Sequence, residues 1–412
     1  MQLMKILILS DNYPPEMNAN ARIISELSQL WAQHNQPISV ITSQPNFPMG
    51  KIFDGYKNTW YVKSIMNGVK VIRVKTYIYP NKGLVRRTLD FISFGLSSFF
   101  FGLFKQTDII IGITPQFFCA LSACFLSIIK KKPFALILCD LWPDSIAAHG
   151  IIKKKFFFKL LKKIEIWMYH RCNLIIILSE HFKSYLNTLG IADPKIIVSI
   201  SGASKQFYPR EKNQKILNDY HLLNKFVVGY IGTFGIAHNH HDLLLIAASL
   251  RKQDNCRVSF FMLGDGAKRA DLIRQKNENT LDNIVIDGPF SGTLIPDYWS
   301  VIDLAIIPLA EVETNKTVLP SKLLEAMSMG IPVLLYAPDG AAKKFLDQSQ
   351  AGWYIPAGDV AALENLIIQL SSNDALLADK KDKAVAFAKN FTREQQANDL
   401  FTHLTTLERA HQ

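Results

Sequence analysis

The feature that most constrains this chain is a regular alternation of short apolar runs with longer segments of helical periodicity. Short runs rich in β-branched residues, separated by helical segments, are typical of parallel sheets that are covered on both faces by crossover helices. Two such series occur, and each predicts one doubly wound α/β domain. The runs are residues 5–10, 38–42, 69–75, 109–114, 134–139 and 174–179, then 227–231, 257–263, 284–286, 304–308 and 333–336.

The junction between the two series marks a domain boundary. At 412 residues the chain is too long for a single core. The polar, turn-rich sequence SGASKQFYPREK, which begins at Ser201, separates the two series. We therefore predict domains at residues 1–205 and 206–388, followed by a helical tail at residues 389–412.

Charge is distributed unevenly between the two halves. Residues 1–205 carry 25 Lys and Arg against 11 Asp and Glu, a net charge of +14, whereas residues 206–412 carry a net charge of −3. A basic half beside a nearly neutral half points to an anionic surface that one domain alone meets. No RRM or zinc-finger pattern accompanies the charge, so we predict no nucleic-acid partner and favour an anionic membrane.

The cysteines and the amino-terminal residues favour the cytosol as the compartment. The five cysteines have no metal-like or redox-like spacing and lie in apolar contexts, which favours reduced, mostly buried thiols. The apolar run at residues 1–10 is followed at once by Asp11 and two prolines. It therefore suits a first strand better than a signal peptide.

Three apolar segments of the first domain bear on membrane contact. Residues 109–129 contain no charge, but Thr114-Pro115-Gln116 divides them into a strand, a turn and a buried helix. Residues 91–104 are rich in Phe and too short to span a bilayer, and they suit either an interfacial helix or a core helix. Residues 153–169 interleave six lysines with aromatic and aliphatic residues, which favours contact with an anionic leaflet over a merely solvated face.

The run LPSKLLEAMSMG predicts a short helix that ends just before an apolar strand. Pro320 suits the first helical turn, and Gly330 suits the position just past the last one. We expect Glu325 on the surface of this helix, where its carboxylate can accept hydrogen bonds from both hydroxyls of a ribose. The free amides around Ser321 and Lys322 would point from the helix start toward a diphosphate.

This run resembles the corresponding segment of retaining glycosyltransferases of family 4, and the resemblance extends along nearly the whole chain. It is most similar to the bacterial subgroup that builds cell-surface polysaccharide, in particular O-antigen transferases of the fucosamine type. The resemblance implies the GT-B fold, in which two doubly wound Rossmann-like domains face a cleft and the final helix crosses back to the first domain. The supporting segments, in chain order, are KILILSDNYPPE, VITSQPNFPMG, DLWPDS, LILSEHF, GYIGTFG, FMLGDG and IVIDGPF.

The resemblance assigns the ribose and sugar contacts to the second domain. Glu325 matches the glutamate that binds the nucleotide ribose. Thr317 stands where the family has a first glutamate that contacts the donor sugar, and Glu311 or Glu313 is close enough in sequence to substitute for it. The carboxylate that contacts the sugar would therefore be Glu311 or Glu313.

The diphosphate contacts also depart from the family pattern. The family supplies an Arg and a Lys just after the first strand of the second domain, where this chain has Gly232, Thr233 and Gly235. The glycines would allow the backbone to approach a phosphate. Lys322 is the best remaining cation, although a surface lysine with a snorkelling stem is an equally open interpretation.

Two further turns belong to this predicted nucleotide site. Gly264 and Gly266 follow a strand and open a helix, at the edge of the sheet where open α/β folds bind ligands. The resemblance places the backbone near Gly288, Pro289 and Phe290 against the uracil base.

Three histidines follow the glycine turn of the second domain. His238, His240 and His241 suggest a zinc site, but no fourth ligand has a suitable spacing, so a surface loop is favoured. We predict no metal ion and no cofactor.

The first domain offers candidates for the acceptor side. Asp140 ends an apolar strand, where its carboxylate could orient the acceptor hydroxyl or act as its base, or could equally be a turn or cap residue. The loop DNYPPEMNANAR lacks the paired glycines usual in the family, and Asn18, Asn20 and Arg22 can donate hydrogen bonds to the phosphate or the acceptor instead.

Together these features predict a retaining, metal-independent glycosyltransferase. It would move a sugar such as N-acetylfucosamine from a UDP-sugar to a polyprenyl-diphosphate-linked acceptor in O-antigen synthesis, in the cytoplasm and peripherally bound to the inner face of the plasma membrane. One alternative is a nucleotide-sugar 2-epimerase of the same fold, which the basic, apolar first domain disfavours. Another is a non-catalytic membrane-docking subunit of a transferase complex, suggested by Thr317 and by the missing Arg and Lys.

Overall fold

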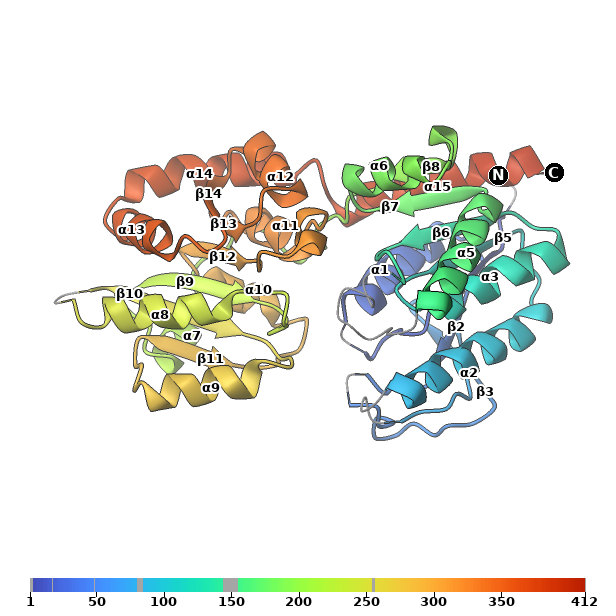
Figure 1. Ribbon diagram of the computed structural model, residues 1–412, viewed down its shortest axis with the longest axis horizontal. Helices are drawn as coiled ribbons and strands as arrows, with labels where there is room; N and C mark the ends of the chain where they lie inside the picture. The colour runs from blue at the N-terminus through green and yellow to red at the C-terminus, as the bar shows by residue number, and fades with distance from the viewer. Residues whose placement is uncertain are drawn as a thin grey trace. The chain divides into compact units, whose positions relative to one another are not determined.

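A computed structural model describes residues 3–16, 18–47, 49–79, 84–143, 155–253 and 256–411. The chain forms two compact units, which we call the amino-terminal and carboxy-terminal units (Figure 1). The amino-terminal unit comprises Met1–Ser201 and Arg393–Gln412, and the carboxy-terminal unit comprises Gly202–Thr392. The chain therefore passes from one unit to the other twice.

The amino-terminal unit is built on an eight-stranded sheet with the order β3-β4-β2-β1-β5-β6-β7-β8. All neighbouring strands are parallel except β3, which pairs antiparallel with β4. The strand order reverses between β1 and β5, because β1 pairs with β2 on one side and with β5 on the other. The strands are β1 (Ile6–Leu9), β2 (Ile38–Ser43), β3 (Tyr61–Met66), β4 (Val69–Val74), β5 (Ile109–Ile113), β6 (Phe134–Leu138), β7 (Leu174–Ile177) and β8 (Ile196–Val198).

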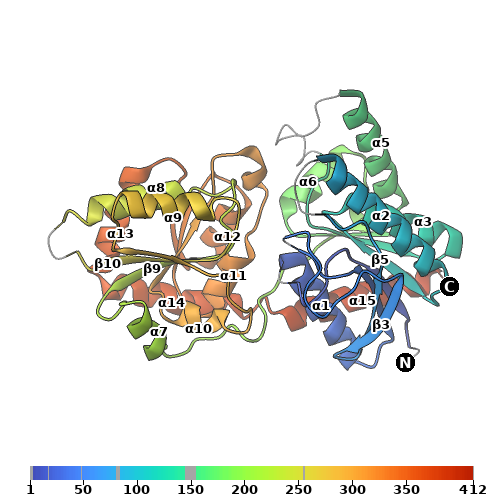
Figure 2. The same ribbon diagram turned by 90° about the horizontal axis from the view of Figure 1, so that it is seen from below.

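Helices cover both faces of this sheet. One face packs against α2, α3, α5 and α6, and the other packs against α1 and α15. Figure 2 shows α2, α3 and α5 on one side of the sheet and α1 and α15 on the other. Apolar side chains that alternate along β1, such as Leu7 and Ile8, therefore enter different cores. The helices are α1 (Ala19–Gln33), α2 (Leu84–Leu103), α3 (Phe117–Lys130), α5 (Lys155–Arg171), α6 (Glu180–Thr188), the 3₁₀ turn η1 (Asp193–Lys195) and α15 (Arg393–His411).

The last helix, α15, completes the amino-terminal unit. Its Leu400 and Leu404 belong to the same core as α1, and the indole Nε1 of Trp31 donates a hydrogen bond of 2.8 Å to the carbonyl oxygen of Ala397. Arg393, the first residue of α15, donates from Nε to the carboxylate of Glu26 at 2.8 Å. The predicted return of the final helix to the first domain is thus confirmed.

The carboxy-terminal unit contains a six-stranded parallel sheet with the order β11-β10-β9-β12-β13-β14. The order reverses between β9 and β12, so this unit is also doubly wound. The strands are β9 (Phe226–Ile231), β10 (Val258–Leu263), β11 (Ile284–Asp287), β12 (Leu304–Pro308), β13 (Val333–Ala337) and β14 (Gly352–Pro356).

Helices again cover both faces of the sheet. Side chains of α8, α9 and α13 form one core with Val228 and Tyr230 of β9. Figure 2 shows α8 and α9 on the opposite side of the sheet from α10 and α14. The helices are α7 (Gln214–Asp219), α8 (His240–Leu250), α9 (Arg269–Glu278), α10 (Ile295–Ser300), the 3₁₀ turn η2 (Glu313–Lys316), α11 (Ser321–Ser328), α12 (Ala341–Ser349), α13 (Val360–Ser371) and α14 (Asp374–Ala388).

The structure confirms two parallel α/β sheets and adds three strands that the apolar runs did not predict. These are β3, β8 and β14. The uncharged stretch at residues 109–129 forms β5, a turn and the largely buried helix α3, as predicted. None of the described helices is long and apolar enough to cross a membrane. Of the lysine-rich segment, α5 is described, whereas Lys153 and Lys154 lie outside the described residues.

Arg393 generates a prediction about stability. Its side chain is 3% exposed and also donates to the hydroxyl of Ser201 at 3.0 Å. Arg393→Met should lower the free energy of unfolding by about 2 kcal/mol, because hydrogen bonds to a charged group are lost from a buried position. Urea denaturation followed by circular dichroism measures this. Arg409→Met, an exposed change on the same helix, should shift it by less than about 0.5 kcal/mol. Equal effects of the two variants would show that Arg393 does not anchor α15.

Candidate functional site

The carboxyl ends of β9, β10 and β11 bring three glycine turns together in the carboxy-terminal unit. The amide of Gly232 donates to the carbonyl of Leu263, and the amide of Gly264 donates to the carbonyl of Asp287, both at 2.9 Å. A Cβ on Gly264 would lie 1.7 Å from the carbonyl oxygen of Gly232, and one on Gly288 would lie 3.0 Å from the amide nitrogen of Gly264. The turns therefore pack backbone against backbone, which only glycine permits at these positions.

Gly266 continues this packing. It has a φ of +149°, and a Cβ there would lie 2.6 Å from the carbonyl oxygen of Phe234. The edge formed by these turns lies beside the point where the strand order reverses, which is where ligands bind in open α/β sheets. The predicted residues Gly232, Gly264 and Gly266 are thus placed together.

Lys322, on the first turn of α11, reaches this edge. Its Nζ donates to the hydroxyl oxygen of Tyr230 at 2.8 Å and lies 3.3 Å from Nε2 of His238. A Cβ on Gly232 would lie 2.8 Å from the same Nζ, so the ammonium lies directly against the glycine turn. Lys322 is half-buried rather than a solvated surface lysine.

Lys322 keeps donor capacity for an external acceptor. An ammonium has three N–H donors, and the described protein atoms engage it through Tyr230 and His238. Burial lowers the pKa of Lys322 to about 7, and the carboxylate of Glu325 opposes this by raising it. The hydroxyl of Tyr230 itself donates a hydrogen bond to the carbonyl oxygen of Thr233 at 2.7 Å. Thr233 itself is exposed at the turn.

The histidines do not form the surface loop that the sequence favoured. His240 is 2% exposed, His238 is half-buried, and His241 alone is exposed. Burial, followed by the Lys322 ammonium, lowers the pKa of His240 to about 3 and that of His238 to about 2, so both imidazoles are neutral at neutral pH. His240 is buried because the rings of Tyr230 and Phe234 pack against it, with centroids 4.6 and 5.1 Å from that of the imidazole.

The described residues do not provide a set of zinc ligands around these histidines. Within the described parts of the chain, no three or more His, Cys, Asp or Glu side chains are grouped so as to hold a metal ion. Neither ring nitrogen of His240 has a hydrogen-bond partner among the described protein atoms. The neutral ring of His238 lies 3.3 Å from the Lys322 ammonium and does not neutralise its charge.

The helix α11 carries the predicted ribose residue, with two differences from expectation. Pro320 precedes the helix as its N-cap, and Ser321 is its first residue. Gly330 has a φ of +71° just past the C-cap, as predicted for its position. Glu325 is 6% exposed rather than lying at the helix surface, because α11 packs against α14 as well as against the sheet.

The predicted sugar-contact residues lie around η2. Thr317 caps this turn, with its hydroxyl donating to the carbonyl of Thr314 at 2.8 Å. Glu311 is exposed, and Glu313 pairs with Lys316 at 2.8 Å. These residues share the loop that precedes α11, so either glutamate is available to a ligand there.

Pro289 and Phe290 follow Gly288 at the end of β11. Pro289 is exposed, and the half-buried ring of Phe290 stacks on Tyr298, with centroids 4.3 Å apart. The hydroxyl of Tyr220 donates to Asp287 at 2.7 Å, one residue before the turn. An aromatic surface therefore adjoins the glycine turns, which suits the flat face of a base.

In the amino-terminal unit, Asp140 also lies at the carboxyl edge of the sheet. Its amide and that of Cys139 are hydrogen-bonded to Oγ1 of Thr114, at 3.3 and 2.8 Å, across the ends of β6 and β5. This places Asp140 one strand from the point where the strand order reverses between β1 and β5. The same edge is the expected ligand-binding edge of this unit.

Two carboxylates at this edge were missed by sequence reasoning. Burial, with Asp90 and Glu16 nearby, raises the pKa of Asp11 well above its usual range. Burial also raises the pKa of Asp90 to about 7, although Arg87 opposes the shift. Asp11 follows β1 directly, but nothing in the sequence indicates that α2 brings Asp90 to it. Raised carboxyl pKa values in such a position make both candidates for proton handling.

The residues predicted to form a loop after β1 belong to α1 instead. Asn18 is the N-cap, and its side-chain oxygen accepts a hydrogen bond from the amide of Ala21 at 2.8 Å. Asn20 and Arg22 lie on the first turn of this helix. The Ser/Asn-type cap could have been read from the sequence as a helix start.

Comparison with known proteins assigns the carboxy-terminal unit. The family described as "Glycosyl transferases group 1" matches residues 225–373, which include every glycine turn and α11. This unit is a group 1 glycosyltransferase domain. WcaI of Escherichia coli K12, assigned as a colanic acid biosynthesis glycosyl transferase, is 24% identical over 79% of this chain and 82% of its own length.

Solved structures show that the group 1 domain belongs to a complete GT-B fold. Sucrose-phosphate synthase from Thermosynechococcus elongatus matches 99% of this chain and 100% of its own, with a TM-score of 0.77 and 14% identity. HepE from Anabaena in complex with UDP-glucose matches 98% of this chain and 100% of its own, with a TM-score of 0.72 and 16% identity. Both units of the chain are therefore accounted for by one fold.

The pKa of Lys322 gives a prediction about pH. An unfolded lysine has a pKa of about 10.4, and the folded value is about 7. Below pH 7 both states are protonated, and the folded state carries the full cost of a buried charge. As pH rises from 7, the folded lysine loses its proton first and that cost falls. Lys322→Met should therefore raise the unfolding temperature more at pH 6 than at pH 9.

Thermal denaturation of both proteins at the two pH values measures this difference. The control is Lys316→Met, which removes an exposed lysine of the preceding turn. Its effect should not change between pH 6 and pH 9. A gain for Lys322→Met that is independent of pH would contradict the low pKa.

Proposed function

We propose that this group 1 glycosyltransferase moves a sugar from a UDP-sugar to a polyprenyl-diphosphate-linked acceptor, with retention and without a metal ion. We place it in family 4, in O-antigen or related surface-polysaccharide synthesis, at the cytoplasmic face of the inner membrane. The transferred sugar would be an N-acetylated amino sugar such as N-acetylfucosamine. The relation to WcaI and the UDP-glucose complex of HepE support this proposal.

The position of Lys322 is the observation on which the proposal rests. Cleavage of a UDP-sugar leaves negative charge on the diphosphate, and catalysis requires donors fixed where that charge develops. The Lys322 ammonium, held by Tyr230 and His238 against the Gly232 turn, provides a fixed cation there. The first amides of α11, at Ser321 and Lys322, add donors at a helix start.

The remaining residues take roles consistent with this placement. Glu325 would accept hydrogen bonds from the ribose hydroxyls. The turn of Gly264 and Gly266 would allow the protein backbone to approach the nucleotide closely, and Phe290 would lie against the base. Thr317 would face the sugar, with Glu311 or Glu313 as its carboxylate partner. Asp140 would orient the acceptor hydroxyl, and Asn18, Asn20 and Arg22 would contact phosphate.

One assay separates this proposal from its alternatives. The protein is incubated with a labelled UDP-sugar, with and without a polyprenyl-diphosphate-linked saccharide, and the products are resolved. Transfer that depends on the lipid acceptor, with the anomeric configuration kept and with EDTA present, supports the proposal. A C2-epimerised UDP-sugar would favour the epimerase, and no reaction with any UDP-sugar would favour the docking subunit.

A binding measurement tests Lys322. Lys322→Gln should weaken UDP binding by roughly ten- to a hundredfold, because a hydrogen bond to a charged group is lost. It should leave uridine binding nearly unchanged, since uridine has no phosphate. Isothermal titration calorimetry with both ligands measures this. Lys316→Gln, in the preceding turn, is the matched control and should bind UDP normally. Equal losses for UDP and uridine would assign Lys322 a structural role.

Asp140 is tested through transfer rather than binding. Asp140→Asn should reduce the rate of transfer by about a hundredfold, the usual scale for a positioned proton-handling group, while UDP affinity stays normal. Asp193→Asn, an exposed carboxylate of the same unit, is the control. A parallel loss of UDP affinity would move Asp140 to the donor side. Unchanged transfer would leave Asp11 and Asp90 as the acids of this edge.

A further inference from the structure

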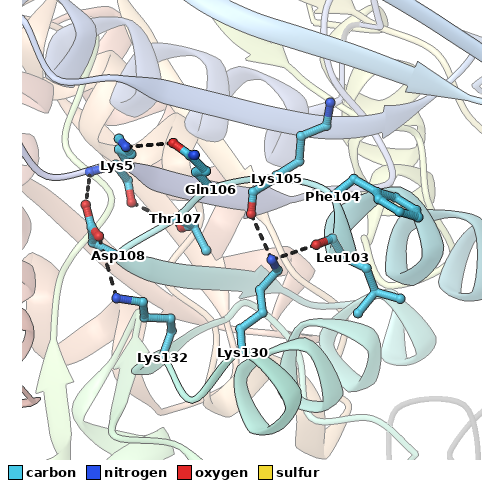
Figure 3. Close-up of a pocket in the computed structure, with 9 residues that line it drawn as sticks. All are labelled: Lys5, Leu103, Phe104, Lys105, Gln106, Thr107, Asp108, Lys130 and Lys132. Atoms are coloured by element: carbon cyan, nitrogen blue, oxygen red, sulfur yellow. Dashed lines mark hydrogen bonds and ion pairs between the residues drawn. The ribbon is translucent and has the colours of Figure 1, made fainter.

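A second basic site lies at the opposite edge of the amino-terminal sheet, where β1 and β5 begin and where α2 and α3 end. It is a cavity of about 600 Å³ (Figure 3). Four lysines and one carboxylate line it, so the lining carries an excess of positive charge. The lining residues are Lys5, Leu103, Phe104, Lys105, Gln106, Thr107, Asp108, Lys130 and Lys132.

Lys130 has a structural role in this cavity. Its Nζ donates to the carbonyl oxygens of Leu103 and Lys105 at 2.8 and 2.9 Å, and so it closes the carboxyl end of α2. Figure 3 shows this ammonium reaching across from α3. A lysine that satisfies the last carbonyls of a helix is a common arrangement. This role accounts for the position of Lys130 but not for the other three lysines of the cavity.

The other three lysines are only lightly engaged. Nζ of Lys5 donates to the side chain of Gln106 at 2.9 Å, and Nζ of Lys132 lies 3.7 Å from Asp108. Nζ of Lys105 donates to the hydroxyl of Tyr61 at 2.9 Å. Each ammonium has three donors, so Lys5 and Lys132 retain donors for an anion in the cavity. Figure 3 shows the Lys105 side chain pointing away from the other lysines, and its ammonium also lies over the Tyr61 ring, 4.9 Å from the centroid.

Exposed apolar side chains adjoin the cavity. Phe104, which lines it, is 71% exposed, and Phe100, one turn earlier on α2, is 55% exposed. Ile129, next to Lys130 on α3, is 58% exposed. Large apolar side chains are exposed in the same way along α2, α3 and α5, at Leu89, Leu96, Phe100, Phe104, Phe125, Ile128, Ile129, Phe156, Leu160 and Trp167.

Cations beside an exposed apolar surface suit an anionic lipid better than a free phosphate. A free phosphate would use the lysines but leave Phe100 and Phe104 in water. An anionic lipid uses both, because its phosphate meets the lysines while its acyl chains receive the aromatic rings. The three helices also form one layer on one face of the sheet, so they can meet a flat surface together.

We propose that this cavity binds the phosphate of an anionic phospholipid, with Phe100, Phe104 and Ile129 inserted beside it into the leaflet. The inference rests on the membrane-surface part of the proposed function, not on its donor chemistry. It assigns α2 and α3, rather than the lysines of α5 alone, as the elements that hold the protein on the membrane.

Vesicle sedimentation tests the proposal. Full-length protein is mixed with vesicles of phosphatidylglycerol and phosphatidylcholine, or of phosphatidylcholine alone, at 0.15 M salt. The protein should bind the anionic vesicles and bind the neutral ones poorly. Lys5→Gln combined with Lys132→Gln should weaken that binding about 30-fold, because each lysine near an anionic surface adds to the attraction.

The matched control removes the same charge elsewhere in the unit. Lys63→Gln with Lys70→Gln, two exposed lysines on β3 and β4, should change binding less than threefold. Circular dichroism confirms that both double variants are folded. Equal weakening by the two pairs would overturn the cavity as a specific site, because net charge alone would then explain the binding.

Two further measurements identify the source of the phosphate and the depth of insertion. Titration with inorganic phosphate should show no binding below about 10 mM, and tighter binding would reassign the cavity to a free anion. Phe104→Trp should add blue-shifted fluorescence, quenched by brominated acyl chains, with anionic vesicles only. No quenching beyond that of the unmodified protein would overturn the insertion.

UDP binding separates this inference from the proposed function. The Lys5 and Lys132 double variant should bind UDP as the unmodified protein does, because both changes lie outside the carboxy-terminal unit. If the unmodified protein binds UDP but ignores anionic vesicles, the lipid site fails alone. If it binds the vesicles but not UDP, the transferase proposal fails and the lipid site stands.

Discussion

Both sheets are covered by helices on both faces, and this drives polar chemistry to the edges where strands end. The carboxyl edge of the carboxy-terminal sheet gathers glycine turns and a cation. The carboxyl edge of the amino-terminal sheet gathers carboxylates with raised pKa values, and its amino edge gathers lysines. Each of these groupings joins residues that are distant in the sequence, because the winding of the sheet brings the ends of neighbouring strands together.

Lys322 shows what it costs to place a charge at such an edge. Burial disfavours its protonated form, yet the groups in direct contact with its ammonium, Tyr230 and His238, are neutral and do not cancel its charge. Gly232 leaves room for the ammonium that any larger residue would occupy. The arrangement is unfavourable for the empty protein and favourable once an anion arrives, which is the usual balance between stability and function.

The elements that could be predicted from the sequence are those that bury apolar side chains on both faces. β3 was missed because nearly all its residues are exposed, and β14 because it begins with Gly and ends with Pro. In the candidate site, sequence placed the glycine turns and α11 correctly. It did not predict that Glu325 and His240 are buried, since burial depends on which neighbours pack over a helix or loop. Nor could it predict that Asp90 influences the pKa of Asp11, because their separation depends on how α2 lies across the sheet.

The double passage between units has a consequence for how the protein is made. The amino-terminal unit combines a segment that is synthesised before the carboxy-terminal unit with one that is synthesised after it, and Trp31 donates its hydrogen bond to Ala397, which lies 366 residues later in the chain. Until α15 is synthesised, the apolar core that it shares with α1 and the sheet lacks the side chains of α15. The carboxy-terminal unit, by contrast, is one continuous segment and can fold as soon as it is complete. In a newly made chain the carboxy-terminal unit is therefore complete before the amino-terminal unit, whose core around α1 stays open to water until α15 packs on it.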